Sequence, residues 1–550
     1  MKKIATLLIL TLFSFSGFST PPVGTWYYQS GDAAIESNWN DDAAGAGTVG
    51  SAGIFSDPAV TFDLNGKASI IVSTGWTLAG TLVNPGIDLS IFNVSNTSTI
   101  VFNGDVQNGD YMTCTPCASV NYHHTTDPVD IIPGTYDNAL VIRDGVTGIA
   151  MGDITAADVE TTNAASVLDM ASFTLTVNIV NIVSGRNGTI QTQNTSSTPI
   201  TLGSGTWKEK IVFNATGAQT VPAGTYADLT ITGSGTKTTG GALTVNGVLS
   251  LTKANASPLL LNLEDALTGT FTTAAGDGVL ILNTNTTAGD LPSGKTWNFN
   301  VSSEQSGYVL PELTMNNSIL DIRENTSLSG AVTLTGTGRI LFHGSGKVLD
   351  CVTFPINCNN NQAIGAFDTD GKIQTQASTG ALTGSILFGD KVVVEFNAAG
   401  AQEVPGGTYR GGITASTSGT KTFTGTVIMA GTLTCASNVV IDANTFPLTI
   451  DFGTLTIAGN GTFYTSNISN APVPTSLDWS SLLEFEYRAG TTKMMAGTYS
   501  DLILNGNGTR TTEGNINCDY FYLTTANEVA QIAPGHSIEC STEANIITSG

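Results

Sequence analysis

Short apolar stretches separated by Gly- and Thr-rich turns run along almost the whole chain. In most of them apolar and polar residues alternate, as in strands with one buried face. The separators, such as Gly-Ser-Gly, Gly-Gly and Asn-Gly, supply the positive-φ positions of tight turns. After Ser19 no segment keeps a 3.6-residue period with caps, so the sequence predicts an all-β protein. A representative run has apolar stretches at residues 228–232, 242–251, 258–263, 269–273, 278–284 and 296–301.

A longer repeat of about ninety residues is superimposed on this pattern. A degenerate copy has Pro311-Glu312 in place of the Gly-Thr-Tyr that marks the others. The segments GTIQTQ from Gly188 and GKIQTQ from Gly371 are separated by two such units. Repetition at a fixed period indicates an array in which each unit contacts its neighbours. Gly-Thr-Tyr marks four copies of the repeat, and it ends at Tyr136, Tyr226, Tyr409 and Tyr499. Successive marker tyrosines are separated by one, two and one repeat unit.

Two architectures fit many short strands in a repeat: a parallel β-helix, or β-solenoid, and a tandem β-sandwich array. Strands in the repeat are separated by only a few residues, without the long return connection of a Greek key. We therefore favour a β-solenoid with coils of roughly 22 residues, a coil being one full turn of the solenoid. Repeats are expected over residues 120–550, as about five units with the last incomplete. Because the last unit is incomplete, we expect this chain to be the N-terminal portion of a longer polypeptide.

Residues 1–19 have the three regions of a secretory signal peptide. Lys2 and Lys3 precede an apolar run from Ile4 to Phe15, and small residues precede a cleavage site after Ser19. The apolar run is too short to span a bilayer, and the mature chain contains no other candidate for a transmembrane helix. We expect a secreted protein or one on the outer cell surface. Residues 20–119 begin with a cluster of aromatic residues and are predicted to form an N-terminal capping segment.

Charged residues make up 12% of the chain, and the formal net charge is −24. This acidity disfavours nucleic acid as a partner. FDTDGK, with Asp368 and Asp370, begins like a calcium loop but lacks the glutamate at position twelve, so we expect a polar turn there. Ca²⁺ bound by acidic loops remains an option, and no other cofactor is expected.

Seven cysteines are too few to hold a chain of 550 residues together. In an oxidising compartment, disulfides are expected within the two pairs that are close in sequence. One cysteine must stay unpaired within the chain. Zinc binding at Cys114, Cys117, His123 and His124 is disfavoured, because adjacent histidines on a strand point to opposite faces. The predicted pairs are Cys114 with Cys117, and Cys351 with Cys358.

No catalytic residue is assigned. The chain has few arginines and four histidines, and we find no dense Asp/Arg/His cluster in the sequence. Acids from different coils could nevertheless meet on one face, as in β-helical polysaccharide lyases and hydrolases. The repeated Gly-Thr-Tyr is interpreted as a structural corner whose ring packs on the next coil. At ninety-residue spacing the four rings lie too far apart to bind one small ligand.

The opening GTWYYQSGD and the repeat GTYADLTITGSGTKTTGGALTVNGVLSL resemble exported repeat proteins of the Bacteroidota. The resemblance covers most of the mature chain. It implies a surface-attached or released adhesin-like β-solenoid, exported by the type IX secretion system, although its C-terminal sorting domain is not seen here. We therefore expect a structural or adhesive protein that attaches to glycans, cells or matrix. The alternatives are a β-helical polysaccharide lyase or glycoside hydrolase, and a passive stalk for a missing C-terminal domain.

Overall fold

The computed structural model describes short segments between Thr25 and Tyr122, and residues 128–546 apart from 144, 179–186, 204, 284–286, 288, 365–369, 489 and 491. In this part of the chain the protein is all-β without an α-helix, and parallel strands stack into a β-solenoid of about 19 turns. The predicted β-solenoid is confirmed, and the sandwich alternative is wrong because successive neighbours are parallel. None of the described segments forms a helix with the length and apolar character of a bilayer span.

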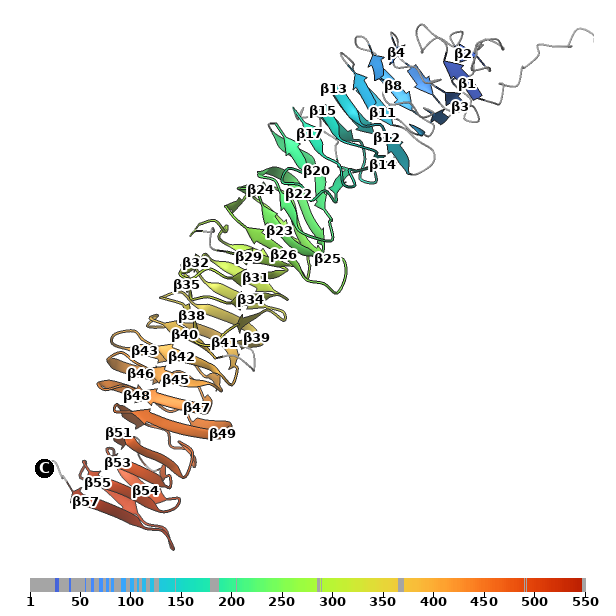
Figure 1. Cartoon of the computed structure of the whole chain (residues 1–550). Helices are drawn as coiled ribbons and strands as arrows, with labels where there is room; N and C mark the ends of the chain where they lie inside the picture. The colour runs from blue at the N-terminus through green and yellow to red at the C-terminus, as the bar shows by residue number, and fades with distance from the viewer. Residues whose placement is uncertain are drawn as a thin grey trace, which may run out of the picture. The chain divides into compact units, whose positions relative to one another are not determined.

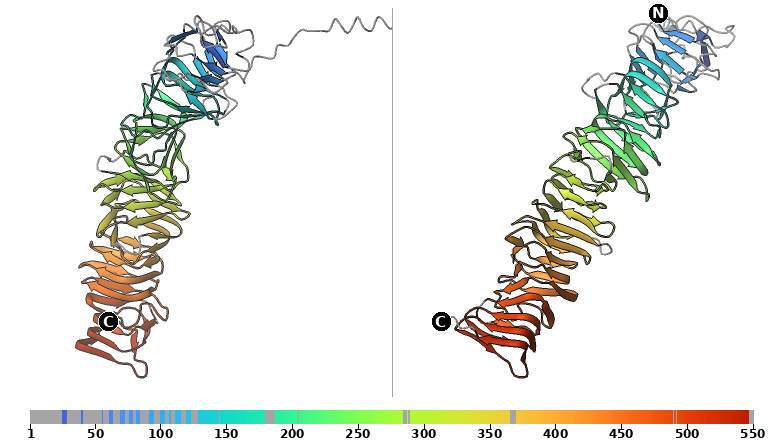
Figure 2. Two further views of the ribbon diagram at one scale, coloured as in Figure 1. Left: turned by 45° about the vertical axis from the view of Figure 1, so that its right-hand side comes forward. Right: turned by 60° about the vertical axis from the view of Figure 1, so that its left-hand side comes forward.

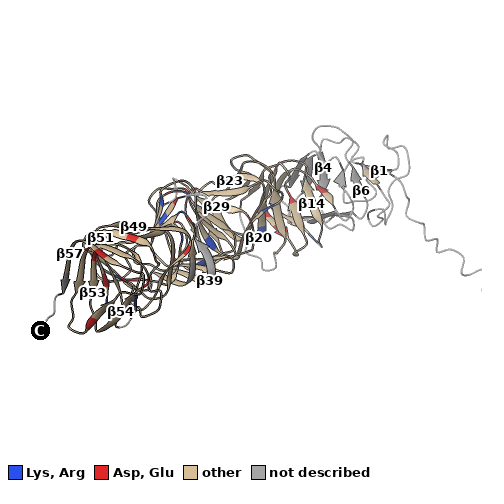
Figure 3. Ribbon diagram, turned by 90° about the horizontal axis from the view of Figure 1, so that it is seen from below, with Lys and Arg blue, Asp and Glu red and all other residues tan. Residues whose placement is uncertain are grey.

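The coil length varies along the repeats. A strand residue pairs with a residue one coil later. The number of residues in the coil is small where Glu484 pairs with Asp501 and large where Ile356 pairs with Leu382. The predicted coil of roughly 22 residues lies between these two cases. Because side chains alternate along each strand, one set fills the interior of every coil and the other faces outward. Lys, Arg, Asp and Glu occupy few positions on the described strands (Figure 3).

The chain divides into two compact units, unit 1 (residues 1–234 and 245–247) and unit 2 (residues 235–244 and 248–550). Figures 1 and 2 show that strands of successive coils lie side by side within each unit. The strands of unit 1 are β1 (Thr25–Tyr28), β2 (Trp39–Asn40), β3 (Thr61–Asp63), β4 (Ser69–Val72), β5 (Trp76–Leu78), β6 (Thr81–Val83), β7 (Ile91–Val94), β8 (Thr99–Phe102), β9 (Val106–Gln107), β10 (Tyr111–Cys114), β11 (Ser119–Tyr122), β12 (Val129–Ile131), β13 (Gly134–Ile142), β14 (Thr147–Ala150), β15 (Ile154–Thr161), β16 (Val167–Asp169), β17 (Leu175–Val177), β18 (Thr189–Thr192), β19 (Ile200–Leu202), β20 (Thr206–Phe213), β21 (Gln219–Val221) and β22 (Gly224–Gly233).

Three sheets form the walls of unit 1, with orders β2-β1-β3-β6-β9, β19-β17-β15-β13-β10-β7-β4 and β12-β14-β16-β18-β20-β22. In the predicted capping segment, β1 and β2 pair antiparallel, whereas β10 and β11 pair parallel with β13. The pairing therefore continues from this segment into the repeats. Trp39 is fully buried against Phe55 and Phe62, with ring centroids 6.2 and 5.2 Å away. This tryptophan therefore packs in the interior of the segment.

Unit 2 has a long sheet running from β23 through β26 and β29 to β49, a second sheet β43-β46-β48-β50-β51-β53-β55-β57, and a third, β52-β54-β56. Its strands, with β24 at the division, are β23 (Gly235–Thr239), β24 (Leu243–Val245), β25 (Val248–Lys253), β26 (Leu259–Leu263), β27 (Leu267–Thr268), β28 (Thr272–Thr273), β29 (Val279–Leu282), β30 (Lys295–Trp297), β31 (Asn300–Ser303), β32 (Tyr308–Leu310), β33 (Leu313–Asn316), β34 (Ile319–Ile322), β35 (Thr326–Leu328), β36 (Val332–Thr335), β37 (Arg339–Phe342), β38 (Lys347–Asp350), β39 (Ile356–Ile364), β40 (Gly371–Thr375), β41 (Leu382–Phe388), β42 (Val392–Phe396), β43 (Gln402–Val404), β44 (Gly407–Tyr409), β45 (Gly412–Ala415), β46 (Gly419–Phe423), β47 (Val427–Cys435), β48 (Val439–Asp442), β49 (Leu448–Gly459), β50 (Thr462–Thr465), β51 (Leu477–Tyr487), β52 (Thr492–Met494), β53 (Gly497–Leu504), β54 (Gly508–Thr512), β55 (Ile516–Leu523), β56 (Glu528–Gln531) and β57 (Ile538–Ile546).

The Gly-Thr-Tyr marker makes the same hydrogen bond in all four copies. Each of these corner tyrosines is buried, with 1% of its surface exposed. Its hydroxyl donates to the backbone carbonyl oxygen four residues earlier, which satisfies a buried acceptor at the corner. The oxygen–oxygen distances are 2.5 Å for Tyr136 and Ile132, 2.6 Å for Tyr226 and Pro222, 2.7 Å for Tyr409 and Pro405, and 2.8 Å for Tyr499 and Met495.

The corner tyrosines also lie in register with the preceding coil. Tyr409 pairs with Phe388, and their rings stack with centroids 4.9 Å apart. The equivalent strand partners are Trp207 for Tyr226 and Trp479 for Tyr499. Large side chains therefore continue from coil to coil inside the solenoid, which gives the marker a structural role.

A buried glutamine explains the repeat of GTIQTQ and GKIQTQ. The Gln402 side-chain amide donates to the carbonyl oxygens of Thr375 and Ala377 at 2.8 and 3.1 Å. Gln219, two repeat units earlier in the chain, donates in the same way to Thr192 and Asn194, at 3.0 Å in both cases. Thr192 and Thr375 belong to the two matching segments. We infer that the two segments are similar because each of them presents backbone carbonyl oxygens to a buried glutamine later in the chain.

Three copies of the repeat also bury a cation, in the Gly-Thr-Lys or Gly-Thr-Arg of β23, β46 and β54. Lys237, Lys421 and Arg510 are each 0% exposed. The Lys421 ammonium donates to the carbonyl oxygen of Ala398 at 2.5 Å, and Arg510 pairs with the buried Glu528. Burial lowers the pKa of Lys237 to about 8. These interior charges were not predicted from the sequence, because lysine and arginine are rarely buried.

Candidate functional site

Five neighbouring strands of unit 2 carry a mixed apolar and polar outward face. In β34, Leu320 and Ile322 point into the core, whereas Ile319 and Asp321 point outward. Asp321 is in register with Ser302 on the coil before and with Leu341 on the coil after. The same alternation in β26, β29, β31 and β37 places an aliphatic surface beside these polar groups.

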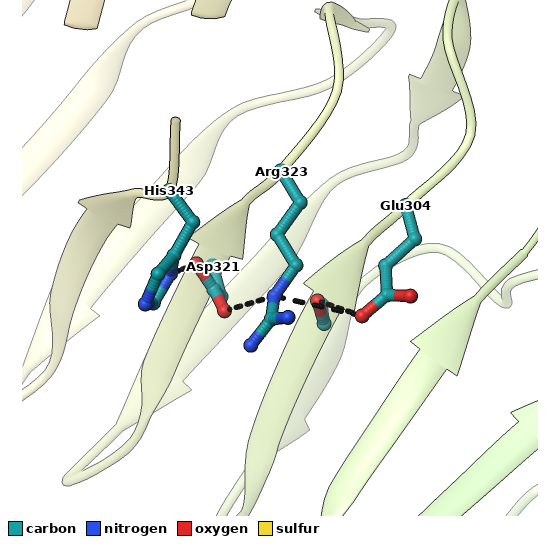
Figure 4. A network of polar contacts seen from close by, with 5 residues as sticks. Glu304, Asp321, Arg323 and His343 are labelled. Atoms are coloured by element: carbon teal, nitrogen blue, oxygen red, sulfur yellow. Dashed lines mark hydrogen bonds and ion pairs between the residues drawn. The ribbon is translucent and has the colours of Figure 1, made fainter. Parts of the chain in front are cut away.

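Charged side chains follow directly after three of these strands. Glu304, Arg323 and His343 each come one residue after the end of β31, β34 and β37. Their backbone amides continue the ladder, since Arg323 N–H donates to Ser303 and His343 N–H donates to Ile322. Equivalent places on successive coils bring these side chains together, as Figure 4 shows.

Asp321 is the centre of the resulting network. Its Oδ2 accepts a hydrogen bond from Arg323 Nε at 2.8 Å, and its Oδ1 lies 2.5 Å from His343 Nδ1. Arg323 Nε also lies 3.5 Å from Glu304 Oε1, which accepts a hydrogen bond from Ser302. The Asp321 side chain is only 10% exposed, whereas those of Arg323 and His343 are 48% and 52% exposed. Asp321 thus positions two groups that solvent and ligands can reach.

The electrostatics of the network keep Arg323 charged. Its hydrogen bond to Asp321 raises the pKa of the guanidinium, and the charges of Asp321 and Glu304 add to this, while partial burial opposes it. Because its Nε is held by carboxylates, the other nitrogens of the guanidinium are available as donors. The contact of His343 Nδ1 with Asp321 similarly leaves Nε2 as the second polar atom of the imidazole.

These groups line a hollow of about 240 Å³, which we call the His343 hollow. This volume lies below the roughly 300–1,000 Å³ of ordinary small-molecule pockets. It suits part of a ligand, such as one ring of a longer chain, better than a fully enclosed molecule. Its lining residues are Leu260, Val279, Ile281, Asn300, Glu304, Ile319, Asp321, Arg323, Leu341 and His343.

The arrangement offers both an apolar surface and polar groups to a ligand. The aliphatic surface can cover the apolar face of a sugar ring, and Arg323, His343 and Glu304 offer donors and an acceptor to its hydroxyl groups. An Asp–His pair can also act as a general base on a water molecule or a substrate proton that lies within hydrogen-bond reach of the imidazole. The other residues lining the hollow are aliphatic apart from Asn300 and the charged groups already described.

Larger hollows elsewhere carry less chemistry. One of about 550 Å³ lies beside β43 and β46, and its only charged lining residue is Glu403. Another of about 510 Å³ lies beside β51 and β53 and is lined by Asp478 and Glu513 among neutral residues. Neither contains a histidine or an arginine. The His343 hollow therefore stands as the candidate site.

The metal candidates from the sequence gain no support. Side chains of Cys114, Cys117, His123, His124 and Asp368 lie outside the described residues. Asp370 is described, and its carboxylate lies 3.5 Å from the Ser345 hydroxyl. Over the described ranges, no three His, Cys, Asp or Glu side chains gather in a way that could hold a metal ion.

Cys351 and Cys358, the second predicted disulfide pair, are both free thiols in the structure. Cys351 directly follows β38, and Cys358 lies in β39, where it pairs with Leu334 and Gly384 of the adjacent coils. The predicted disulfide is not formed. Burial raises the pKa of the Cys358 thiol to about 12, so this group is a poor nucleophile.

The network at Asp321 is an Asp/Arg/His cluster in space, although no dense cluster of this kind was found in the sequence. Asp321 and Arg323 are close in sequence, but Glu304 and His343 each lie about one local coil from Arg323, on either side of it. The cluster therefore becomes visible only when the coil length is known at that place. A search for acidic, basic and histidine residues spaced by one coil could have found it.

No family model, no curated protein and no solved structure matches this chain.

Proposed function

We propose that the protein is an exported structural repeat protein of the cell surface that binds glycans through the outward faces of its solenoid. The β-solenoid fold is compatible with a structural or surface repeat protein. The repeated residues, including the corner tyrosines and Gln219 and Gln402, are interior. The outward face varies from coil to coil and is free to carry binding groups.

The His343 hollow is the observation that carries the proposal. It combines an aliphatic surface with Arg323 and His343, both held by the nearly buried carboxylate of Asp321. Groups fixed in this way lose little conformational entropy on binding, so they favour a polyhydroxylated ligand with an apolar face. A single hollow of this size gives weak affinity, which several copies of the protein on one surface would raise through multivalency.

The test is binding of the purified protein to an array of immobilised polysaccharides and oligosaccharides. Arg323→Met keeps the aliphatic stem but removes the donors, and we expect it to weaken binding to the preferred glycan by at least tenfold. Arg339→Met is the matched control, because Arg339 is an exposed arginine on the outward face of β37 and does not line the hollow. Equal loss in both variants, or no loss in either, contradicts the proposed site.

The same samples distinguish the alternative functions. Mass spectrometry of the glycans after incubation detects any cleavage product, and product that Asp321→Asn abolishes would establish a polysaccharide-degrading enzyme. Complete absence of binding across the array would favour a passive stalk. Protease treatment of intact cells checks the surface location, since we expect the protein to be cleaved without cell lysis.

A further inference from the structure

Cys518 and Cys540 lie next to each other on neighbouring coils. Cys518 is in β55 and Cys540 in β57, and the two residues are direct partners in the parallel ladder. Their sulfur atoms are 3.3 Å apart. Partners in such a ladder have Cα atoms about 4.8 Å apart, which falls within the range of roughly 4.4–6.8 Å found for disulfides.

The other described cysteines have different surroundings. Cys435 lies between Ala415 and Gly459 of the adjacent coils, and its sulfur contacts the carbonyl oxygens of Val439 and Thr462. Cys351 and Cys358 are buried in the core. Among the described residues, Cys518 and Cys540 are thus the pair whose geometry allows a bond after a small movement of the two sulfur atoms.

From this geometry we propose that Cys518 and Cys540 form a reversible disulfide that joins the coils of β55 and β57. The sulfur atoms need to approach by roughly 1.2 Å to reach the bond length of about 2.05 Å. Cys540 is partly exposed, whereas Cys518 is buried at 4% exposure, so an external oxidant reaches Cys540 first.

The oxidant is a small-molecule or protein disulfide. The Cys540 thiolate attacks one of its sulfur atoms, forms a mixed disulfide and releases the other sulfur as a thiolate. The Cys518 thiolate then attacks Cys540 Sγ, closes the bond between the coils and releases the second thiolate. The protein loses two protons and two electrons in total, and the oxidant disulfide is reduced to two thiols.

The environment of Cys518 makes the second step the slow one. Burial raises the pKa of its thiol, and the contact with Cys540 and the nearby Asp519 and Asp501 add to this. The thiolate fraction therefore rises with pH, and closure should become faster between pH 7 and pH 9. Closure would fix β57 against β55 and limit local opening of this strand pair. The inference is independent of glycan binding.

The experiment uses the full chain, reduced and then incubated with oxidised glutathione, with alkylation of the remaining thiols and non-reducing peptide mapping. We expect a peptide pair linked through Cys518 and Cys540 in most molecules, at a rate that increases with pH. Cys435→Ser should leave this link intact, and Cys540→Ser should abolish it.

Hydrogen exchange gives a second readout on the wild-type chain, which avoids any folding defect of a variant. We expect oxidation to slow exchange in residues 538–546 at least tenfold and to leave residues 313–342 unchanged. Stable glutathione adducts on Cys540 without the intramolecular link, or a link of Cys518 to another cysteine, would overturn the proposal.

Discussion

Replacing Arg510 by methionine should destabilise the coils around β54 by about 3–5 kcal/mol, because it leaves the Glu528 carboxylate buried without its counter-ion. Both side chains of this ion pair are 0% exposed. Glu528 also accepts hydrogen bonds from the Gly506 amide at 2.8 Å and the Thr525 hydroxyl at 3.0 Å. These two bonds cannot replace the lost positive charge.

Native-state hydrogen exchange in β54 and β56 is the appropriate measurement, since a solenoid opens locally before it unfolds as a whole. The expected change corresponds to at least a hundredfold faster exchange. Lys493→Met is the matched control, because Lys493 of β52 pairs with Glu513, which directly follows β54, and both side chains are about one-third exposed. Breaking that surface pair should cost at most about 1 kcal/mol.

The double variant Arg510→Met/Glu528→Met separates the charge from the packing. Because it removes both charges, it should recover most of the stability that Arg510→Met loses. If the double variant is as unstable as Arg510→Met, the loss comes from packing and the buried ion pair is not the cause.

Tyr409→Ala should destabilise its repeat unit by about 3–5 kcal/mol, because it removes a buried ring that stacks on Phe388 and leaves a cavity. Tyr409→Phe keeps the ring but removes the donor to the Pro405 carbonyl oxygen, and should cost about 1–3 kcal/mol. The ratio of the two losses separates packing from hydrogen bonding at the corner. Equilibrium unfolding and hydrogen exchange of β44 and β45 measure both.

Tyr520→Phe is the control for the hydroxyl. Tyr520 is half-buried on β55, and its ring lies against the neighbouring Tyr522, with centroids 6.0 Å apart. Removing the Tyr520 hydroxyl should change the free energy of unfolding by no more than about 0.5 kcal/mol. An effect as large as that of Tyr409→Phe would contradict a special role for the corner tyrosines.

The interior of this fold was predictable from sequence because its contacts repeat. The hydrogen bond from a corner tyrosine to the carbonyl oxygen four residues earlier requires the same residue type in each copy, so Tyr136, Tyr226, Tyr409 and Tyr499 stand out. Gln219 and Gln402 recur for the same reason. Such residues report the coil-to-coil contacts of the core and carry little information on the outward face.

The candidate site and the cysteine pairing were not predicted, because both depend on local coil length. Residues one coil apart are neighbours in space, and the length of that coil changes from place to place along the repeats. Cys351 and Cys358 are close in sequence but are not bonded, whereas Cys518 and Cys540 are a whole coil apart and are direct partners. Closeness in sequence is thus a poor guide to closeness in space in this fold.

Disulfide trapping between engineered cysteines tests the central claim most directly, namely that each strand pairs in parallel with the strand one coil later. Thr314 and Thr333 are outward-facing direct partners in β33 and β36, whereas the partner of Asn316 is Thr335. We predict rapid cross-linking of Thr314→Cys/Thr333→Cys and little cross-linking of Thr314→Cys/Thr335→Cys, whose diagonal separation is about 7–8 Å. Preferential cross-linking of the second variant, or none in either, would contradict the parallel coil register.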